Sequence, residues 1–250
     1  MVNDLQRASM WKRISAYLLD AILLGIVVVG IAWLMSLAFG YDTYVSKFDE
    51  ACIKYEEKYG VDLDADYTSL TDTEKSSYDA AFNELSSDNE AQYAYSMMIN
   101  LTFTIISISI LIGYILLELV VPLLLKNGQT LGKKVFGIAL MRTDGVKMSN
   151  LSLFVRTILG KYTVETMIPV LIVVLIIFNG AGLGGTVALA LIALLQLILL
   201  GATRTRSAIH DLLACTVAVD FTSQLIFNTP EELMEYKKKL HAEESLNKEW

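Results

Sequence analysis

Two ionisable side chains lie inside long apolar stretches of this sequence, where they are the residues best placed to do chemistry. Asp20 lies in an apolar run over residues 14–39, and Glu118 lies in another over residues 97–125. A charged side chain at the centre of a bilayer is costly, so such a residue marks either an ion pathway or a structural pair. On neighbouring helices, Asp20 and Glu118 could share a proton or coordinate a cation.

Both carboxylates need partners, and nearby basic residues supply candidates. Arg13 precedes Asp20 by seven residues, so the two lie on nearly the same face of a helix but about 10 Å apart along its axis. Arg13 can extend to the lipid headgroups and leave Asp20 to another cation. The candidates for that role, besides Arg13, are Arg156, Arg204 and Arg206. The structural alternative for Glu118 is a hydrogen bond to a neighbouring helix, or an ion pair with Arg156 or Lys161.

Membrane-spanning helices must position these residues. A span needs roughly 20 mostly apolar residues, and both runs above are long enough. Residues 163–200 form a run too long for one span, broken by the glycine-rich sequence 179–185, which predicts two short helices in a hairpin. The alternative for this hairpin is one buried or re-entrant element, because its arms are short.

The composition agrees with a membrane protein and excludes several other classes. Apolar side chains make up 54% of the chain and charged ones 19%, against about 45–50% and about 25% in soluble domains. The net charge of −7 argues against a nucleic-acid binder. Two cysteines, Cys52 and Cys215, cannot build a disulfide framework, and no Cys/His cluster predicts a metal or cofactor. No catalytic nucleophile can be assembled either, so we expect a protein that is not an enzyme.

The distribution of lysine and arginine predicts the orientation. Residues 126–162 carry seven basic side chains and one acidic one, whereas residues 40–96 carry four lysines and fourteen acidic side chains. Basic loops stay on the cytoplasmic side. The amino terminus, the 126–162 loop and the carboxyl tail are therefore expected in the cytoplasm, with the acidic segment outside.

These observations predict an all-α membrane protein with four transmembrane helices, both termini cytoplasmic, a small helical outer insertion and a short cytoplasmic β element. Its parts are the amino terminus and first span (1–39), the acidic insertion (40–96), the second span (97–125), the basic loop with an interfacial helix (126–162), the third and fourth spans (163–201) and the tail (202–250).

Local signals refine this outline. A helix is expected over 44–59 with Gly60 as its terminator, and Thr71 to Glu74 forms a capping box. The β-prone runs 135–141 and 216–219 could pair, with Asp144–Gly145 as a turn.

Two further helix starts are predicted nearer the carboxyl end. Ser149 is expected to cap an amphipathic helix that ends at Lys161 and lies at the membrane interface. The sequence Thr229-Pro230-Glu231-Glu232 is expected to open a final charged helix.

Two motifs resemble ligand sites but lack essential residues. Asp62, Asp64 and Asp66 have the spacing of a calcium loop, yet Tyr67 and Thr73 stand where glycine and a bidentate glutamate are needed. The glycine–lysine run at 128–133 has three residues between its glycines, where a phosphate-binding loop has four.

Several short motifs occur in a characteristic order. They are Arg13 and Asp20 in the first span, then Gly128, Thr130, Gly132 and Lys133 after the second, then Asp144–Gly145, and finally His210 with Asp211. In this order the sequence resembles the RDD family of prokaryotic membrane proteins, named for one arginine and two aspartates. The resemblance covers about residues 11–39 and 100–220, whereas the 41–96 insertion, the closing tail and Glu118 look peculiar to this chain. Family sequences tend to have glycine where this chain has Cys215, which predicts a less tight turn there.

The resemblance implies transport at most, because a few family members are linked to sodium–proton exchange. Asp20 would then carry the proton or cation, Glu118 would be its partner, and Arg13 and Asp211 would form a cytoplasmic gate. Four spans are few for a transporter and no inverted repeat is visible. We therefore expect a non-enzymatic scaffold or assembly component of the prokaryotic cell membrane, with the small cation/proton transporter as the alternative.

The expected partners follow from the same features. They are the lipid bilayer, a second copy of the chain in a homo-oligomer, and an unidentified protein bound through the outer insertion or the tail. Nucleic acid is not expected as a partner.

Overall fold

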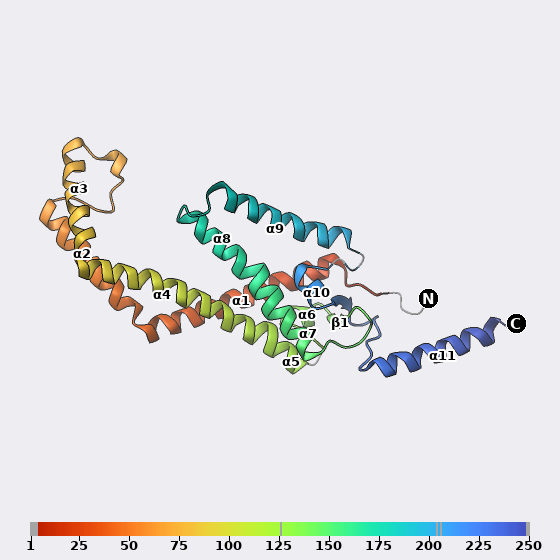
Figure 1. The fold of residues 1–250 in the computed structure, drawn as a ribbon. Helices are drawn as coiled ribbons and strands as arrows, with labels where there is room; N and C mark the ends of the chain where they lie inside the picture. Colours follow the sequence, from red (N-terminus) through yellow and green to blue (C-terminus); the bar gives the residue numbers. More distant parts are fainter. Residues whose placement is uncertain (1–4, 126, 204, 206, 249–250) are drawn as a thin grey trace. The chain divides into compact units, whose positions relative to one another are not determined.

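The structure is a computed structural model and describes residues 5–125, 127–203, 205 and 207–248 (Figure 1). Its helices are α1 (Met10–Phe39), α2 (Tyr41–Tyr59), the 3-10 turn η1 (Tyr67–Ser69), α3 (Asp72–Ser87), α4 (Asn89–Tyr114), the π-helical η2 (Ile115–Val120), α5 (Val121–Leu125), α6 (Leu131–Val135), α7 (Asn150–Phe154), the π-helical η3 (Val155–Met167), α8 (Ile168–Ile177), α9 (Gly182–Ala202), α10 (Ile209–Leu213) and α11 (Pro230–Lys248). The strands are β1 (Ile138–Arg142) and β2 (Thr216–Asp220). The chain forms two compact units, one of which is Val27–Ile110 and the other the rest of the described chain.

Four helical stretches in the described residues are long and apolar enough to cross a membrane, which confirms the predicted spans. They are Met10–Phe39, Asn89–Leu125, Asn150–Ile177 and Gly182–Ala202. Large apolar side chains stand exposed along them, such as Val29 at 70% and Leu197 at 67%. An exposed apolar surface of this extent marks a membrane-facing protein.

The third span differs from its expected boundaries. The predicted interfacial helix and the apolar run from residue 163 form one continuous helix, Asn150–Ile177, which begins where Ser149 caps it. The helix is not broken at residue 162, because the π-helical η3 carries it without interruption into α8. The two arms of the hairpin therefore have 28 and 21 residues and are not short.

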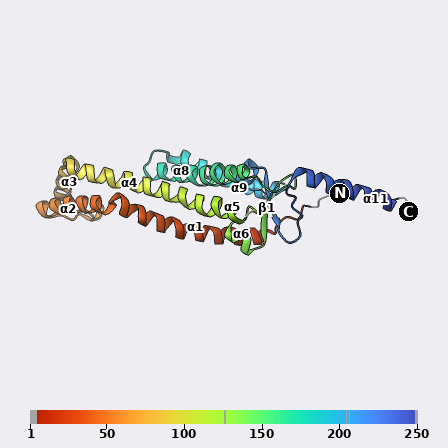
Figure 2. The same ribbon diagram turned by 90° about the horizontal axis from the view of Figure 1, so that it is seen from below.

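The turn between α8 and α9 lies at the glycine-rich sequence. The two helices overlap in the view of Figure 2, and Figure 1 shows that they diverge from this turn, near which they are in contact. The Gly180 amide donates to the Leu175 carbonyl at 2.7 Å, and Asn179 adopts a left-handed φ of 55°. A Cβ at Gly185 would lie 2.8 Å from Cγ1 of Ile176, so glycine lets α9 approach α8 closely here.

The two strands form a small antiparallel sheet, as predicted. Leu140 lies opposite Ala218 in the centre of the register. On the outer edge of β2, the Asp220 amide donates to the Gln6 carbonyl at 2.9 Å, and Arg7 bridges Val219. The segment that precedes α1 thus pairs with the free edge of β2 over a few residues. Ala8 and Ala16 pack with Ile138 and Leu140 in the core beside the sheet.

The Asp144–Gly145 turn also forms. Gly145 adopts a φ of 94°, and Met141 bridges Lys147 across it. Val146 packs with Phe227 and Leu233, so this turn connects the sheet to α11.

The final helix α11 begins at Pro230 as expected, with Thr229 Oγ1 accepting from the Glu232 amide at 3.2 Å. The Glu232 carboxylate accepts from the amide of Asn228 at 2.8 Å. The acidic first turn is therefore held by the residues that precede the helix.

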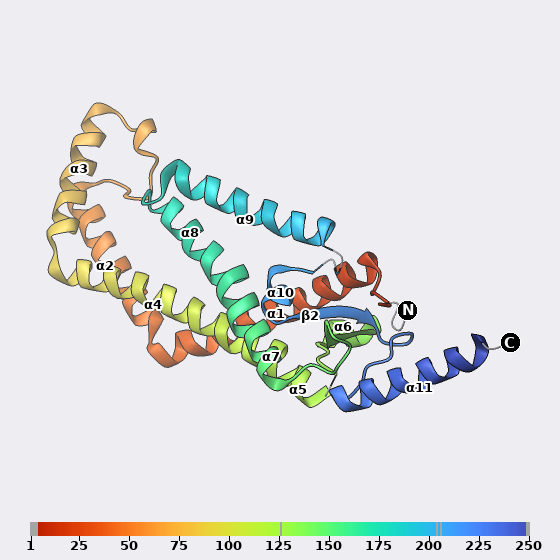
Figure 3. The same ribbon diagram turned by 45° about the vertical axis from the view of Figure 1, so that its right-hand side comes forward.

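The unit Val27–Ile110 contains the acidic insertion, in which α2 and α3 pack side by side (Figure 3). Gly60 ends α2 with a φ of 65°, and Thr71 and Glu74 form the predicted capping box. Tyr55, Ala81 and Leu85 are its buried core. The unit is therefore a folded helical pair with its own core.

Two of the three aspartates before α3, Asp62 and Asp66, accept hydrogen bonds within local turns. Asp62 accepts from the Asp64 amide at 2.9 Å, and Asp66 accepts from the Thr68 amide at 3.0 Å. In the part of the chain that the structure describes, no cluster of three or more His, Cys, Asp or Glu side chains could hold a metal ion.

Candidate functional site

Asp20 is held by the start of α6. Thr130 caps this helix and donates its hydroxyl to Oδ2 of Asp20 at 2.5 Å, while the Gly132 amide donates to Oδ1 at 2.7 Å. Lys133 Nζ lies 3.7 Å from Oδ2 of Asp20 and also donates to the Thr130 hydroxyl at 3.1 Å. The first amides of a helix lack partners within it, so a carboxylate here satisfies donors that would otherwise be unpaired.

The glycines of this loop permit that contact. A Cβ at Gly132 would collide with the Ala16 carbonyl oxygen and lie 2.9 Å from Cγ of Asp20. Gly128 adopts a φ of 62°, and a Cβ there would lie 2.6 Å from Cε of Met148. Between them, the Gln129 amide group donates to the Ile138 carbonyl at 2.8 Å and ties the loop to β1. The loop that contains Gly128, Thr130, Gly132 and Lys133 thus connects Asp20 to the sheet.

The prediction that Arg13 or Arg156 is the cation partner of Asp20 is therefore wrong. Arg13 and Arg156 contact Asp211 instead, and Lys133 is the cation near Asp20. The loop could not be identified as the partner because a five-residue helix leaves no periodic pattern in the sequence. Arg204 and Arg206 lie outside the described residues.

Asp211 is the centre of a second charged group. Arg156 donates through Nε to Oδ1 at 2.9 Å, and Nη2 of Arg13 lies 3.7 Å from Oδ2. Thr216 donates its hydroxyl to Oδ1 at 3.2 Å. Burial alone would raise the pKa of the Asp211 carboxyl, but the charge and hydrogen bond of Arg156, together with the charge of Arg13, hold that pKa well below its usual range. Asp211 is therefore a fixed anion between two helices and the sheet.

His210 pairs with Glu165, a residue that the sequence analysis missed. The ring Nδ1 lies 2.7 Å from Oε2 of Glu165, and the His210 amide donates to Oε1 at 3.0 Å. Burial lowers the pKa of the His210 imidazole, against the opposing effect of the Asp211 carboxylate. A neutral ring with its proton on Nδ1 satisfies this contact. The sequence signal that could have identified Glu165 was its position, since it is an acidic residue just inside the apolar run over residues 163–200.

Gly160 explains how α10 reaches η3. A Cβ at this glycine would lie 2.5 Å from Cβ and 2.7 Å from Cα of His210. The two helices therefore touch backbone to backbone, which brings His210 and Asp211 to Glu165 and Arg156.

Glu118 pairs with Lys161, the structural alternative that the sequence left open. Lys161 Nζ lies 2.5 Å from Oε1 of Glu118, and Thr157 donates to the Glu118 backbone carbonyl at 2.9 Å. The other carboxylate oxygen, Oε2, has no hydrogen-bond partner among the described residues. The interactions found join Glu118 to η3 and Asp20 to α6, and none found in the described chain joins the two carboxylates to each other.

The π-helical turns bring these partners together. Arg156 and Lys161 are five residues apart and would lie about 140° apart around an α-helix. The wider π turn, closed by bonds between residues five apart, brings them nearer to one face, and both are almost fully buried at 2% and 8% exposure. Such segments often occur at functional sites.

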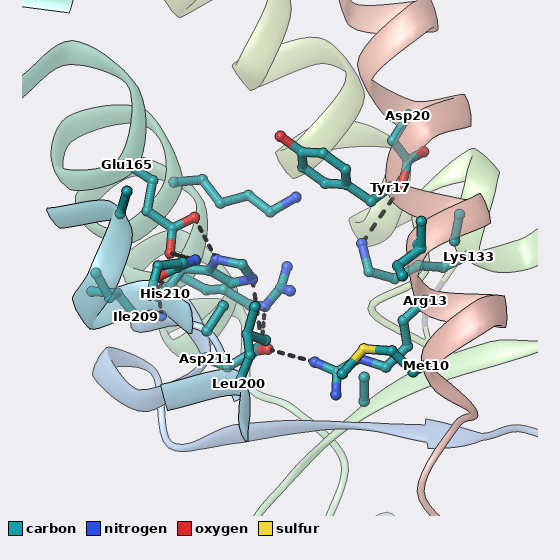
Figure 4. Close-up of a pocket in the computed structure, with 18 of the residues that line it drawn as sticks. Met10, Arg13, Tyr17, Asp20, Lys133, Glu165, Leu200, Ile209, His210 and Asp211 are labelled. Carbon is teal, nitrogen blue, oxygen red and sulfur yellow. Dashed lines mark hydrogen bonds and ion pairs between the residues drawn. The ribbon is translucent and has the colours of Figure 1, made fainter. Parts of the chain in front are cut away.

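A cavity of about 570 Å³ lies between these charged groups and the apolar helices. Figure 4 shows Glu165 and His210 on one wall and Asp20 and Lys133 on the opposite wall, with the Arg13–Asp211 ion pair between them. Burial lowers the pKa of Lys133 to about 8, and the nearby charges of Lys161 and Arg156 act in the same direction. Sites of this volume hold small molecules or parts of larger ones.

Cys215 corrects another expectation. The turn between α10 and β2 is tight, because Cys215 adopts a φ of 51° and its amide donates to the Leu212 carbonyl at 3.1 Å. This left-handed conformation favours glycine. The cysteine therefore occupies a glycine-type turn without opening it.

Four helices long and apolar enough to cross a membrane, three of which carry buried or half-buried ion pairs, define a multi-pass membrane protein. The family model described as the RDD family matches residues 7–215, most of the chain, and the chain belongs to that family. Comparison with curated proteins and with solved structures gives no match.

Proposed function

We propose that this protein is a non-enzymatic scaffold or assembly component of a membrane. The observation that carries the proposal is that all four buried or half-buried carboxylates of the site have fixed partners. Asp20 is held by α6, Glu118 by Lys161, Glu165 by His210 and Asp211 by Arg156 and Arg13. A network of this kind supports a rigid bundle more than a moving ion pathway.

The network crosses between elements that are distant in sequence. Asp211 on α10 joins α1 through Arg13 and η3 through Arg156, while Asp20 joins α1 to the loop before β1. Removing one member of a buried pair leaves the other charged and desolvated, at a cost of about 3–5 kcal/mol. These pairs therefore lock the sheet end of the helices.

The setting we propose is the prokaryotic cell membrane with both termini in the cytoplasm. The support is the seven basic residues in 126–162 against the excess of acidic residues in 40–96. The sheet and the charged network would then face the cytoplasm. The folded α2–α3 pair would lie outside, where it and α11 are the candidate surfaces for a protein partner or a second copy.

Cation/proton transport is the second candidate. It is favoured by the cavity, because Asp20 and Lys133 both line it and the pKa of Lys133 lies at about 8. The Asp20–Glu118 pair that this mechanism needs is less favoured, because Glu118 forms an ion pair with Lys161.

Ion flux in proteoliposomes tests the two candidates. Wild-type protein and Asp20→Asn are reconstituted, and sodium-driven proton flux is measured beside protein-free vesicles. The scaffold proposal expects no flux above the protein-free level, together with a lower melting temperature for Asp20→Asn because one acceptor of α6 is lost. Sodium-dependent flux that Asp20→Asn abolishes would overturn the scaffold and support transport.

A further inference from the structure

The cavity has two chemically different halves. The charged half is formed by Arg13, Asp20, Lys133, Arg156, Lys161 and Asp211, together with the paired side chains of Glu165 and His210. The apolar half is formed by Ile14, Pro169, Leu189, Ile192, Ala193 and Leu200. These six residues belong to α1, α8 and α9, which are parts of candidate membrane spans, whereas Ile138, Ala208, Ile209 and Ala218 line the cavity from outside the spans. A ligand that fills both halves must therefore be polar at one end and apolar at the other.

Two basic side chains, Arg156 and Lys161, leave hydrogen-bond donors unused in the charged half. The carboxylates accept from Thr130, Gly132 and Arg156, as described above. Arg156 has five N–H groups, and only its Nε has an acceptor in the described part of the chain. Lys161 uses one of three donors on Glu118. The missing partner is therefore an acceptor, and an anionic one fits best.

The charges point the same way. Lys133, Arg156 and Lys161 lie close enough for Lys161 and Arg156 to lower the pKa of Lys133, after burial itself. Each of the three cations already has one carboxylate partner, Asp20, Asp211 or Glu118, and a further anion would bind the donors that these carboxylates leave unused. Basic pockets between membrane helices commonly hold lipid headgroups.

We propose that this cavity binds one anionic phospholipid, with its phosphate on Arg156, Lys133 and Lys161 and the start of its acyl chains along Ile192 and Leu189. The volume of 570 Å³ accommodates the headgroup and the first part of the chains. The remaining chain lies against the apolar surface of the spans. Binding of this lipid holds α9 against α1 and is independent of whether the protein is a scaffold or a transporter.

Thermal unfolding of the full chain in detergent tests the proposal. The probes are phosphatidylglycerol, phosphatidylcholine with the same acyl chains, and soluble glycerol phosphate. We expect phosphatidylglycerol alone to raise the melting temperature in a saturable manner. An equal effect of phosphatidylcholine would overturn the requirement for an anion, and an equal effect of glycerol phosphate would overturn the requirement for a lipid.

Two matched variants locate the site. Ile192 lines the cavity, whereas its neighbour Leu191 is 60% exposed and does not. Ile192→Trp is expected to weaken phosphatidylglycerol binding roughly tenfold or more, and Leu191→Trp to leave it unchanged. Equal binding by both variants would overturn the cavity as the site. If Ile192→Trp does not fold, Ala193→Leu fills part of the cavity from the same helix with a smaller side chain. It is expected to weaken phosphatidylglycerol binding in the same way.

The headgroup contact has its own control. Lys133→Gln removes a cation of the cavity, and Lys134→Gln removes the exposed lysine beside it. We expect roughly tenfold weaker binding only for Lys133→Gln, because a hydrogen bond to a charged group is lost. Unchanged binding by Lys133→Gln would overturn the proposed phosphate site.

Discussion

Arg13 and Asp211 lie 198 positions apart in the sequence, and their side chains meet with Nη2 of Arg13 3.7 Å from Oδ2 of Asp211. Arg156 takes the other carboxylate oxygen at 2.9 Å. Arg13 and Asp211 are therefore paired within one buried cluster, and this ion pair connects the first span to the segment after the last one.

Asp211→Asn should destabilise the protein by about 3–5 kcal/mol, because it leaves Arg156 buried without an anion. Denaturant or thermal unfolding in detergent measures this loss. Asp144→Asn is the matched control, since its ion pair with Arg142 is half-exposed and such pairs contribute little. Equal effects of the two variants would contradict the central role of Asp211.

Gly160→Ala should be strongly destabilising, because the new methyl group would lie 2.5 Å from Cβ of His210. Gly25→Ala serves as the control, since a Cβ there meets nothing within 4 Å and alanine favours a helix by about 0.5–1 kcal/mol. Comparison of the two melting temperatures provides the measurement. A neutral Gly160→Ala would mean that α10 does not touch η3.

Cys215→Gly should stabilise the protein by up to about 1 kcal/mol. The left-handed conformation costs a non-glycine residue about 1–2 kcal/mol, of which the greater freedom of glycine in the unfolded chain offsets a part. Cys215→Ala keeps the penalty and should unfold like the wild type. Stabilisation by alanine as large as that by glycine would assign the effect to the thiol.

Because of Lys133, the free energy of unfolding should vary with pH in the alkaline range. Its pKa is about 8 in the folded protein and 10.5 in the unfolded chain, so between these values the unfolded state binds more protons. Stability therefore rises with pH over this window, by at most about 1.4 kcal/mol per pH unit from this group. The rise should be smaller in Lys133→Gln than in Lys134→Gln, as followed by unfolding at pH 7–10. Identical pH profiles would mean that Lys133 is solvated.

The topology can be tested with the two natural cysteines. Cys52 lies in α2, and Cys215 is exposed beside the sheet. A membrane-impermeant thiol reagent applied to intact cells should modify Cys52 alone, with Cys215 reacting after permeabilisation. Labelling of both from outside would contradict the four-span arrangement with both termini in the cytoplasm.

Much of the fold could be predicted because its signals are local. Apolar length revealed the four spans, and short polar motifs revealed the caps at Thr71 and Ser149. The pairing of β1 with β2 followed from two β-prone runs. These signals depend on residues within a few positions of one another.

The partners within the site could not be predicted in the same way. Asp20 binds backbone and hydroxyl donors 110 and 112 positions away, and backbone amides have no signature in a sequence. The pairing of Lys161 with Glu118 depends on π-helical turns, which shift faces that an α-helical period assigns. The contacts of the motif residues could therefore be found only in the structure.

The pairing of Gln6 and Arg7 with β2 has a consequence for biosynthesis. The Gln6 carbonyl accepts from the amide of Asp220, 214 positions later. At about 5–20 residues per second, a ribosome needs about 10–40 s to supply that partner after Gln6 is made. All four candidate spans are synthesised during this interval, so Gln6 and Arg7 reach their final place only after the last span has been made.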